Sequence, residues 1–243
     1  MKIHKDVSLH VHQRDKLKNQ LLIKELNWSD KQKEFLRIAL NKEAKLIFLG
    51  GPAGTSKTLM AVYASLKLLS DKKVSDIVYL RSAVESADTK LGFLPGTAEE
   101  KLHFYNLPFY EKLEELLPQS QLQILEKEKR ISAFPINYAR GLNWNAKTII
   151  LDEAQNSTYK EIITILTRLG HFSKCFILAD PMQTDLTNGK VGGFERLQGL
   201  FNDELSAKMG IYSFNFGEED IKRSELVKFI VKKVNNPALK QLH

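Results

Sequence analysis

A glycine-rich segment around residue 54 carries the residue types that bind a phosphate chain. Residues 51–58 read GPAGTSKT and fit the pattern G-x-x-x-x-G-K-[ST] at every defined position except one, where Ser56 stands in place of glycine. In this pattern the backbone N–H groups surround the phosphates, Lys57 reaches the β- and γ-phosphates, and the Thr58 hydroxyl binds Mg²⁺. A tight turn before a helix would explain the glycines but not the Lys-Thr pair. The sequence therefore predicts that ATP and Mg²⁺ are bound by Gly51, Pro52, Ala53, Gly54, Thr55, Ser56, Lys57 and Thr58.

Ser56 is the departure from this pattern. It adds a side chain where the backbone approaches a phosphate closely and where a glycine-like φ is expected. We therefore expect either weaker nucleotide binding or a slightly reshaped loop.

Two adjacent carboxylates follow a predicted strand later in the chain. Residues 148–155 read TIILDEAQ, which places Asp152 at the carboxyl end of a buried strand, where open α/β sheets bind ligands. We expect Asp152 to hold Mg²⁺ through its water shell and Glu153 to orient and deprotonate the attacking water. Two acids that only cap the next helix are the alternative, but a chain with a phosphate-binding loop has a specific use for both. Hydrolysis of the γ-phosphate is the reaction that these residues predict.

A third apolar run, 175–179, leads to Asp180 and then to the sequence PMQTD. If this run is the neighbouring strand, its carboxyl end lies beside the same crevice, and Gln183 is expected to contact the γ-phosphate or the attacking water. An ordinary turn after a strand would contain the same residues. Cys175, the single cysteine, lies within the apolar run and is expected to be a buried thiol without a chemical role.

The elements that position these residues alternate between strands and helices. Continuous apolar or β-branched runs, typical of parallel strands covered on both faces, predict strands at 45–49, 77–80, 148–151, 175–179 and 211–216. Helices are predicted after Ser29, which acts as the N-cap, at 59–69, 159–169, 194–201 and 224–234, with a mostly helical insertion at about 89–130. This order predicts an α/β fold with a doubly wound, mainly parallel sheet.

The composition indicates a folded protein with basic ends. Of the 243 residues 43% are hydrophobic and 27% charged, and no apolar run approaches the roughly 20 residues that span a bilayer, so we expect a cytoplasmic protein without membrane contact. The net charge is +7, and it is concentrated at 1–20, with five Lys or Arg against two Asp, and at 221–243, with six against one Glu. Basic ends favour a nucleic-acid partner, although solvated lysines give the same pattern. A metal site at His10 and His12 is disfavoured because no further ligand stands nearby.

Several segments, taken in order, resemble the PhoH family of P-loop ATPases. They read GPAGTSKT, LRSAVES, KLGFLPG, YARGLNWNAKTIILDEAQN, ILTRLG, LADPMQTDL and DIKRSELVKFIV. The resemblance spans about residues 30–235 and implies a RecA-like P-loop NTPase core, similar to one half of a superfamily-one helicase. We therefore divide the chain into a basic extension at 1–25, a PhoH-like domain at 26–235 that contains the insertion, and a tail at 236–243.

The resemblance also implies roles for single residues. By position, Gln32 reads the adenine, Gln183 senses the γ-phosphate, and Arg223 approaches the nucleotide of an adjacent subunit. Arg81 and Arg140 fall where family members contact phosphate or nucleic acid.

These roles predict a ring assembly. An arginine finger is worth roughly 10³ to 10⁵ in rate, and we expect no second RecA-type domain in this chain, so Arg223 is expected to act in trans within a head-to-tail hexamer. The predicted function is an ATPase that moves or remodels RNA or single-stranded DNA. The alternative is a nucleotide-gated binding module with little turnover, which Ser56 favours. A small-molecule kinase is disfavoured because Glu153 supplies a base for water.

Overall fold

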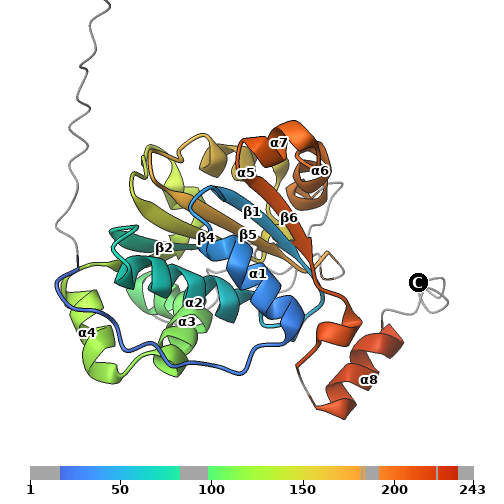
Figure 1. Ribbon diagram of the computed structural model, residues 1–243, viewed down its shortest axis with the longest axis horizontal. Helices are drawn as coiled ribbons and strands as arrows, with labels where there is room; N and C mark the ends of the chain where they lie inside the picture. Colours follow the sequence, from blue (N-terminus) through green and yellow to red (C-terminus); the bar gives the residue numbers. More distant parts are fainter. Residues whose placement is uncertain (1–16, 83–97, 182, 184–191, 223, 235–243) are drawn as a thin grey trace, which may run out of the picture.

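A parallel sheet forms the centre of the protein (Figure 1). The computed structural model describes residues 17–82, 98–181, 183, 192–222 and 224–234. Within them six strands lie in the order β3-β2-β4-β5-β1-β6, and every neighbouring pair is parallel. The strands are β1 Leu46–Gly50, β2 Asp76–Arg81, β3 Ile131–Pro135, β4 Lys147–Asp152, β5 Lys174–Ala179 and β6 Ile211–Asn215. The predicted α/β fold with a mainly parallel sheet is confirmed.

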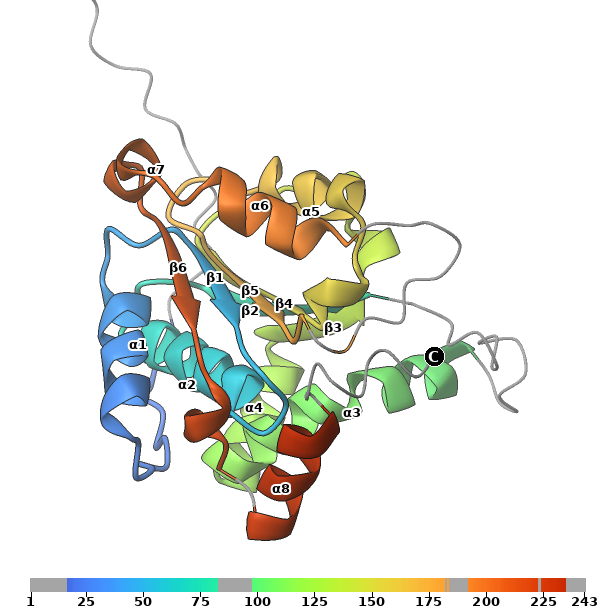
Figure 2. The same ribbon diagram turned by 90° about the vertical axis from the view of Figure 1, so that its right-hand side faces the viewer.

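Helices cover both faces of this sheet, as a doubly wound fold requires (Figure 2). One face carries α1 Asp30–Leu40, α2 Lys57–Ser70, α3 Ala98–Leu116 and α4 Gln119–Lys127. The other face carries α5 Tyr159–Leu166 and α6 Gly193–Leu200. The remaining helical segments are α7 Glu204–Lys208, α8 Glu225–Val234 and the 3₁₀ turns η2 Ile136–Ala139, η3 Ala154–Asn156 and η4 Glu218–Asp220.

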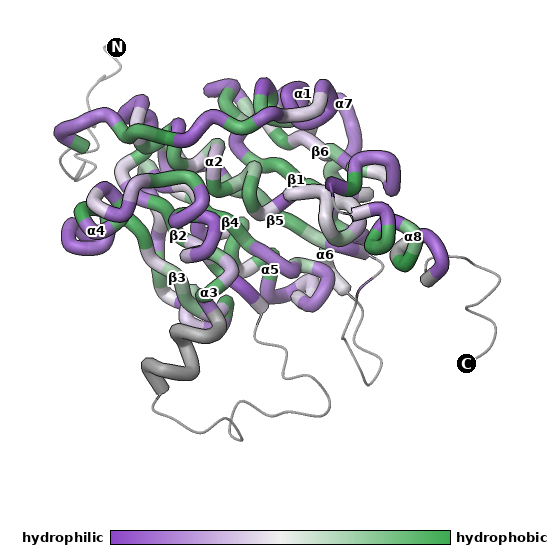
Figure 3. The backbone as a smooth tube through the Cα atoms, turned by 90° about the horizontal axis from the view of Figure 1, so that it is seen from below, coloured by the Kyte–Doolittle hydropathy of each residue, from purple (hydrophilic) through white to green (hydrophobic). Residues whose placement is uncertain are grey.

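The strands divide their side chains between two hydrophobic clusters. On β1, Ile47 and Leu49 join the cluster formed with α1 to α4, whereas Leu46 and Phe48 join the cluster formed with α5 and α6. Successive strand residues point to opposite faces, so a strand covered on both faces needs apolar residues at every position. This is why the strands are continuous apolar runs in the sequence. It is also why the strands at the centre of Figure 3 are mostly coloured as hydrophobic.

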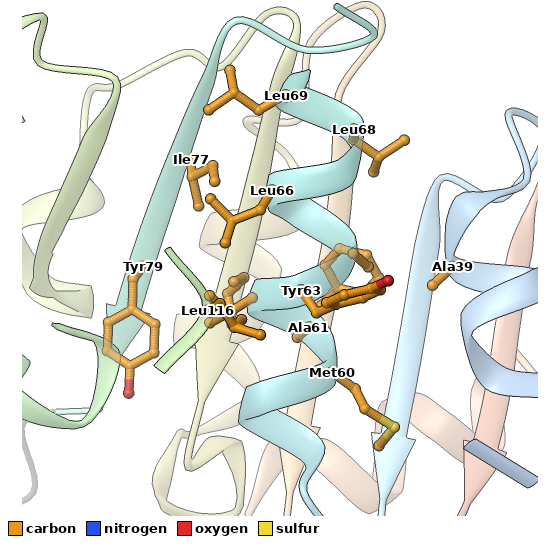
Figure 4. Packing of buried hydrophobic residues seen from close by; sticks show 14 of the residues in the cluster. Ala39, Met60, Ala61, Tyr63, Leu66, Leu68, Leu69, Ile77, Tyr79 and Leu116 are labelled. Atoms are coloured by element: carbon orange, nitrogen blue, oxygen red, sulfur yellow. The ribbon is translucent and has the colours of Figure 1, made fainter. Parts of the chain in front are cut away.

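Helix α2 is the element that connects the phosphate-binding loop to the core. It packs along β2, with Leu66, Leu69 and Ile77 fully buried between them (Figure 4). Burying one such side chain stabilises the fold by about 1.5–3 kcal/mol. The first residue of the helix is Lys57, so this packing fixes where the loop ends.

Three details differ from the prediction. Strand β3 was not predicted, because it is an edge strand paired only with β2 and its sequence, ISAFP, contains a serine and ends at Pro135, which has no N–H to donate. The short helix α7 was also not predicted. Helix α5 ends at Leu166 rather than 169, because the next residues turn back and Leu169 forms a bridge with Trp144.

The predicted N-cap of α1 is confirmed. Ser29 and Gln32 form a capping box, in which each side chain accepts a hydrogen bond from the other residue's backbone N–H. Part of the predicted extension lies against the core, since Leu17 is buried and the N–H of Leu21 donates to Ser70 Oγ at 2.9 Å. Residues 1–16, 89–97 and 236–243 of the predicted segments, with His10 and His12, lie outside the described residues.

Two further expectations concern burial and membranes. Cys175 is fully buried, as predicted, and burial raises the pKa of its thiol, which keeps it protonated. Among the described helices, none is both long and apolar enough to cross a membrane.

Candidate active site

A cavity of about 390 Å³ lies at the carboxyl ends of β1, β4 and β5. Residues predicted from three separate segments line it: Lys57 and Thr58, then Asp152 and Glu153, and finally Gln183. The fold therefore brings together the residues that the sequence singles out for ATP hydrolysis. This position, at the carboxyl edge of a parallel sheet, is where α/β folds bind ligands.

The loop backbone depends on glycine at two positions. Gly54 has φ +85° and Gly51 has φ +151°, a region that side chains rarely adopt. A Cβ at Gly51 would also lie 2.8 Å from Cβ of Phe216 and 3.1 Å from its carbonyl oxygen. The loop is thus packed against the end of β6 as closely as a backbone without a side chain permits.

Ser56 has the glycine-like backbone that the sequence led us to expect. Its φ is +65° and its ψ is +26°, in the left-handed region, and it is the N-cap of α2 without any hydrogen bond from its side chain to the helix. A left-handed conformation costs a residue with a Cβ about 1–2 kcal/mol. The hydroxyl of Ser56 makes no capping bond that would offset this cost.

Lys57 lies folded over its own loop. Its Nζ donates to the carbonyl oxygens of Gly51 at 2.7 Å and Pro52 at 3.0 Å. Burial lowers the pKa of Lys57, and three nearby carboxylates, of which Asp180 has the largest effect, act in the opposite direction. The ammonium group is therefore positioned at the loop, among negative charges that favour its protonated form.

The Thr58 hydroxyl and the Asp152 carboxylate are the residues that fit a magnesium ion. Thr58 Oγ1 donates to Asp152 Oδ2 at 2.9 Å, which places two hard oxygen atoms side by side at the cavity. The described residues include no group of three or more His, Cys, Asp or Glu that could hold a metal alone. Mg²⁺ bound beside a nucleotide needs only one or two protein ligands, because phosphates and water supply the others.

The structure adds Tyr79, which sequence reasoning missed. Its hydroxyl donates to the same Asp152 Oδ2 at 2.9 Å, and the N–H of Glu153 donates to Oδ1 at 3.0 Å. Burial raises the pKa of Tyr79 well above its usual value, so the hydroxyl remains a donor. In the sequence this tyrosine is one residue of an apolar strand, and nothing there indicates that it reaches a carboxylate 73 positions away.

Glu153 stands at the cavity in a strained backbone conformation, with φ +54°. Its Oε2 accepts a hydrogen bond from Gln155 Nε2 at 2.5 Å, and its Oε1 lies 3.9 Å from Arg81 Nη2. Burial raises the pKa of Glu153, and the charge of Asp152 raises it further. The hydrogen bond from Gln155 and the positive charge of Arg81 act against this. A carboxylate with a raised pKa is a stronger base for water.

Gln155 joins the two strand ends on either side of the cavity. Its Oε1 accepts a hydrogen bond from the N–H of Asp180 at 3.0 Å, while its Nε2 holds Glu153. The N–H of Gln183 in turn donates to the carbonyl of Asp180 at 3.0 Å, and its side chain is exposed at the cavity. Gln183 thus lines the cavity, and its role as the γ-phosphate sensor stays a prediction.

Two other predicted residues, Gln32 and Arg140, do not line the cavity. Gln32 is fully buried, and its side-chain amide takes part in the capping box of α1. The same amide donates to the carbonyl of Thr55 at 3.4 Å, so Gln32 contacts the loop. Arg140 is exposed and lines a separate, smaller hollow beside Lys160. Arg223 lies outside the described residues.

Three charged residues that were not predicted also line the cavity. Lys112 and Glu115 come from α3, and Lys222 follows η4, where its N–H donates to the carbonyl of Gly54 at 2.9 Å. These positions follow from how distant elements pack, which no local pattern in the sequence reveals.

Comparisons with known proteins show which family the chain is similar to. Residues 26–235 match the family model described as PhoH-like protein. A PhoH-like protein of Bacillus subtilis is 35% identical over 200 residues, which are 82% of this chain and 60% of that protein. Protein PhoH of Escherichia coli K12 is 34% identical over 201 residues, 82% of this chain and 54% of that protein. The chain thus spans a little over half the length of these curated relatives.

Among solved structures, Pif1 helicases resemble the chain distantly. The crystal structure of Pif1 helicase from Candida albicans has a TM-score of 0.39 and 17% sequence identity, covering 79% of this chain and 40% of that chain. Bacteroides sp Pif1 in complex with ADP-AlF4 has a TM-score of 0.38 and 16% identity, covering 84% and 44%.

Replacing Ser56 tests the strain in the loop. We expect Ser56→Gly to raise the free energy of unfolding by about 0.5–1 kcal/mol, because relief of the left-handed strain exceeds the entropy that glycine adds to the unfolded chain. Ser56→Ala is the matched control, since it keeps the Cβ and removes only the hydroxyl, and it should stay close to the wild type. Urea unfolding monitored by circular dichroism measures both. Equal stabilities of the two variants would show that this conformation is not strained.

Proposed function

The chain belongs to the PhoH-like protein family and has a P-loop NTPase core, and from this premise we propose that it is a Mg²⁺-dependent ATPase. The observation that carries the proposal is the 2.9 Å hydrogen bond between Thr58 and Asp152 in the cavity that Lys57 and Glu153 also line. It supports a shared site for a metal ion, a phosphate chain and a base.

Binding of the phosphates rests on the loop and the start of α2. The loop N–H groups and the positive end of the helix attract the anionic phosphates. Lys57 has to exchange its hydrogen bonds to the carbonyls of Gly51 and Pro52 for bonds to phosphate oxygens. Mg²⁺, held by Thr58 and Asp152, would neutralise the negative charge that develops on the γ-phosphoryl group.

The hydrolytic step uses Glu153 as the base. Its carboxylate accepts a proton from a water molecule while the water oxygen bonds to the γ-phosphorus. The bond from that phosphorus to the β–γ bridging oxygen breaks, so ADP and inorganic phosphate form, and Glu153 later releases the proton to solvent. We assign the orientation of this water to Gln183, a role that is supported by its position in the lining of the same cavity, after β5.

We also propose that the ATPase assembles into a ring. Cations of this chain that line the cavity among the described residues are Lys57, Lys112 and Lys222. None of these has the planar, bidentate donor group with which arginine stabilises a phosphoryl transition state. We therefore keep Arg223 of a neighbouring subunit as the finger, within a head-to-tail hexamer.

Replacing Glu153 tests the base. Glu153→Gln should bind ATP with affinity near that of the wild type but lower turnover at least about 100-fold, because the amide cannot accept the proton. Lys57→Ala is the comparison, since it should lose binding and turnover together. Binding is measured by calorimetry with a non-hydrolysable ATP analogue, and turnover by phosphate release. Wild-type turnover in Glu153→Gln would remove this residue from the base role.

The pH dependence of turnover tests the environment of Glu153. The base works only when deprotonated, so turnover should fall as the pH drops through its raised pKa, above the ordinary value of 4.5. Arg81→Gln removes a positive charge that lowers this pKa, so the fall in turnover at acidic pH should move to higher pH. Arg196→Gln is the control, because that guanidinium packs 4.4 Å from the ring of Tyr159 instead. This account would be contradicted if turnover in Arg81→Gln fell at the same pH as in the wild type, or at a lower one.

Nucleic acid is the partner that we propose for the ATPase. The net charge of +7 supports a polyanion. Near the carboxyl edge of the sheet, Tyr138 is 67% exposed and Arg140 is exposed beside Lys160, a combination suited to stacking and phosphate contact. The strain at Ser56 favours the second candidate, a binding module that is gated by ATP and hydrolyses it poorly.

Phosphate release with and without nucleic acid separates these candidates. We expect RNA or single-stranded DNA to stimulate turnover severalfold, and Arg140→Ala to weaken the stimulation while leaving basal turnover unchanged. Lys72→Ala, which changes an exposed lysine in the turn after α2, is the control for charge alone. ATP binding without turnover, under all conditions, would favour the gated module.

A further inference from the structure

Tyr79 connects the metal-binding carboxylate to the helical insertion. The residue is fully buried on β2, and its ring is directed along the strand toward the carboxyl edge (Figure 4). The ring stacks on Phe109 of α3, with centroids 4.8 Å apart and planes 9° from parallel. Its hydroxyl donates to Asp152 Oδ2 at 2.9 Å. One side chain thus contacts both the insertion and the carboxylate.

The hydrogen bonds around Asp152 leave its carboxylate little freedom to rotate. Oδ2 accepts from Thr58 and from Tyr79, and Oδ1 accepts from the N–H of Glu153. Two of these donors belong to the loop–helix and strand–turn segments that form the cavity. Tyr79 is the donor that lies on the side covered by α3.

Helix α3 is in turn held against the sheet and exposed to the cavity. Asn106 Nδ2 donates to the carbonyl of Ala133 at 2.9 Å, which ties the helix to β3, and Phe109 is fully buried. About one and two turns further along the helix, Lys112 and Glu115 line the cavity. A ligand that contacts these two residues acts on the same helix that supports the ring of Tyr79.

We propose that Tyr79 is a positioning residue through which helix α3 sets the orientation of the Asp152 carboxylate and thereby the affinity of the site for Mg²⁺. This inference rests on the proposed function, because it concerns the metal that accompanies ATP. If Asp152 only satisfied the hydrogen bond that a buried tyrosine hydroxyl needs, metal affinity would depend on Thr58 and Asp152 alone. Hydrogen-bond partners of metal ligands typically change metal affinity 10- to 100-fold.

Tyr79→Phe separates these cases, because it keeps the stacked ring and removes only the hydroxyl. The readout is the thermal stabilisation of the protein by ATP while Mg²⁺ is titrated, which requires no turnover. We expect the Mg²⁺ concentration at half of the full effect to rise about 10-fold. The stabilisation by ATP in EDTA should not change, because the phosphate loop is intact.

Tyr63→Phe is the matched control. Tyr63 is also a buried tyrosine that donates to a carboxylate, Glu25 Oε2 at 2.7 Å, but it lies on α2 away from the cavity lining. It should lose folding stability without a change in the Mg²⁺ titration. If the wild type responds to Mg²⁺ and Tyr79→Phe has the same Mg²⁺ midpoint as Tyr63→Phe, the inference is wrong and the proposed function stands. If the wild type shows no Mg²⁺-dependent effect of ATP, both are wrong.

Phe109→Leu tests the part played by α3 while the Tyr79 hydroxyl stays in place. It loosens the stack, so the Mg²⁺ midpoint should rise about threefold, a modest coupling between contacting residues. In the Tyr79→Phe background the same change should add nothing further, because the hydroxyl through which α3 acts is gone. Full additivity of the two changes, or an unchanged midpoint in Phe109→Leu, would overturn the role of the helix. Should Tyr79→Phe fail to fold, the Phe109→Leu titration decides the question alone.

Discussion

The carboxylate of Asp152 is 5% exposed at the end of a strand in the middle of the sheet, and a charge buried there has to be compensated. The compensation comes from the Thr58 hydroxyl, the Tyr79 hydroxyl and the N–H of Glu153. Because these donors must all reach one group, α2, β2 and the turn after β4 take a single arrangement. The protein's own contacts therefore position residues 51–58 and Glu153 relative to each other, and groups positioned in this way limit the reorganisation that the proposed catalysis requires.

Strand alternation explains why the insertion can take part in this arrangement. Arg81 on β2 pairs with Asp152 on β4, and Tyr79 lies two residues before Arg81, on the same face. Tyr79 and Ile150 both belong to the hydrophobic cluster of α1 to α4, so Asp152, two residues after Ile150, is directed to the face that α2 and α3 cover. The alternation of side chains along β2 and β4 thus places the insertion beside the carboxylate that we propose as the Mg²⁺ ligand.

The sequence was sufficient for features that depend on local order. It located the loop at 51–58 between a strand and a helix and the acidic pair at the end of β4, because both follow continuous apolar runs that mark buried parallel strands. It was insufficient where function depends on contacts across the fold. Tyr79 and Lys112 resemble ordinary core and surface residues in sequence, and edge strand β3 lacks the apolar run of a strand covered on both faces. Gln32 combines both kinds of contact: its capping bond with Ser29 is local, whereas its hydrogen bond to the loop is made across the fold.

Two residues with left-handed backbones, Ser56 and Glu153, both line the cavity where we expect the γ-phosphate. Each costs about 1–2 kcal/mol, and each is held by an element that is itself buried, α2 for Ser56 and β4 for Glu153. A ligand gains most where the free protein is already held in the bound conformation. The strain at Ser56 is therefore compatible with binding, and the greater obstacle is Lys57, whose two hydrogen bonds to its own loop have to be exchanged for phosphate contacts. That exchange lowers ATP affinity without affecting Glu153, so weak binding of nucleotide would not by itself exclude turnover.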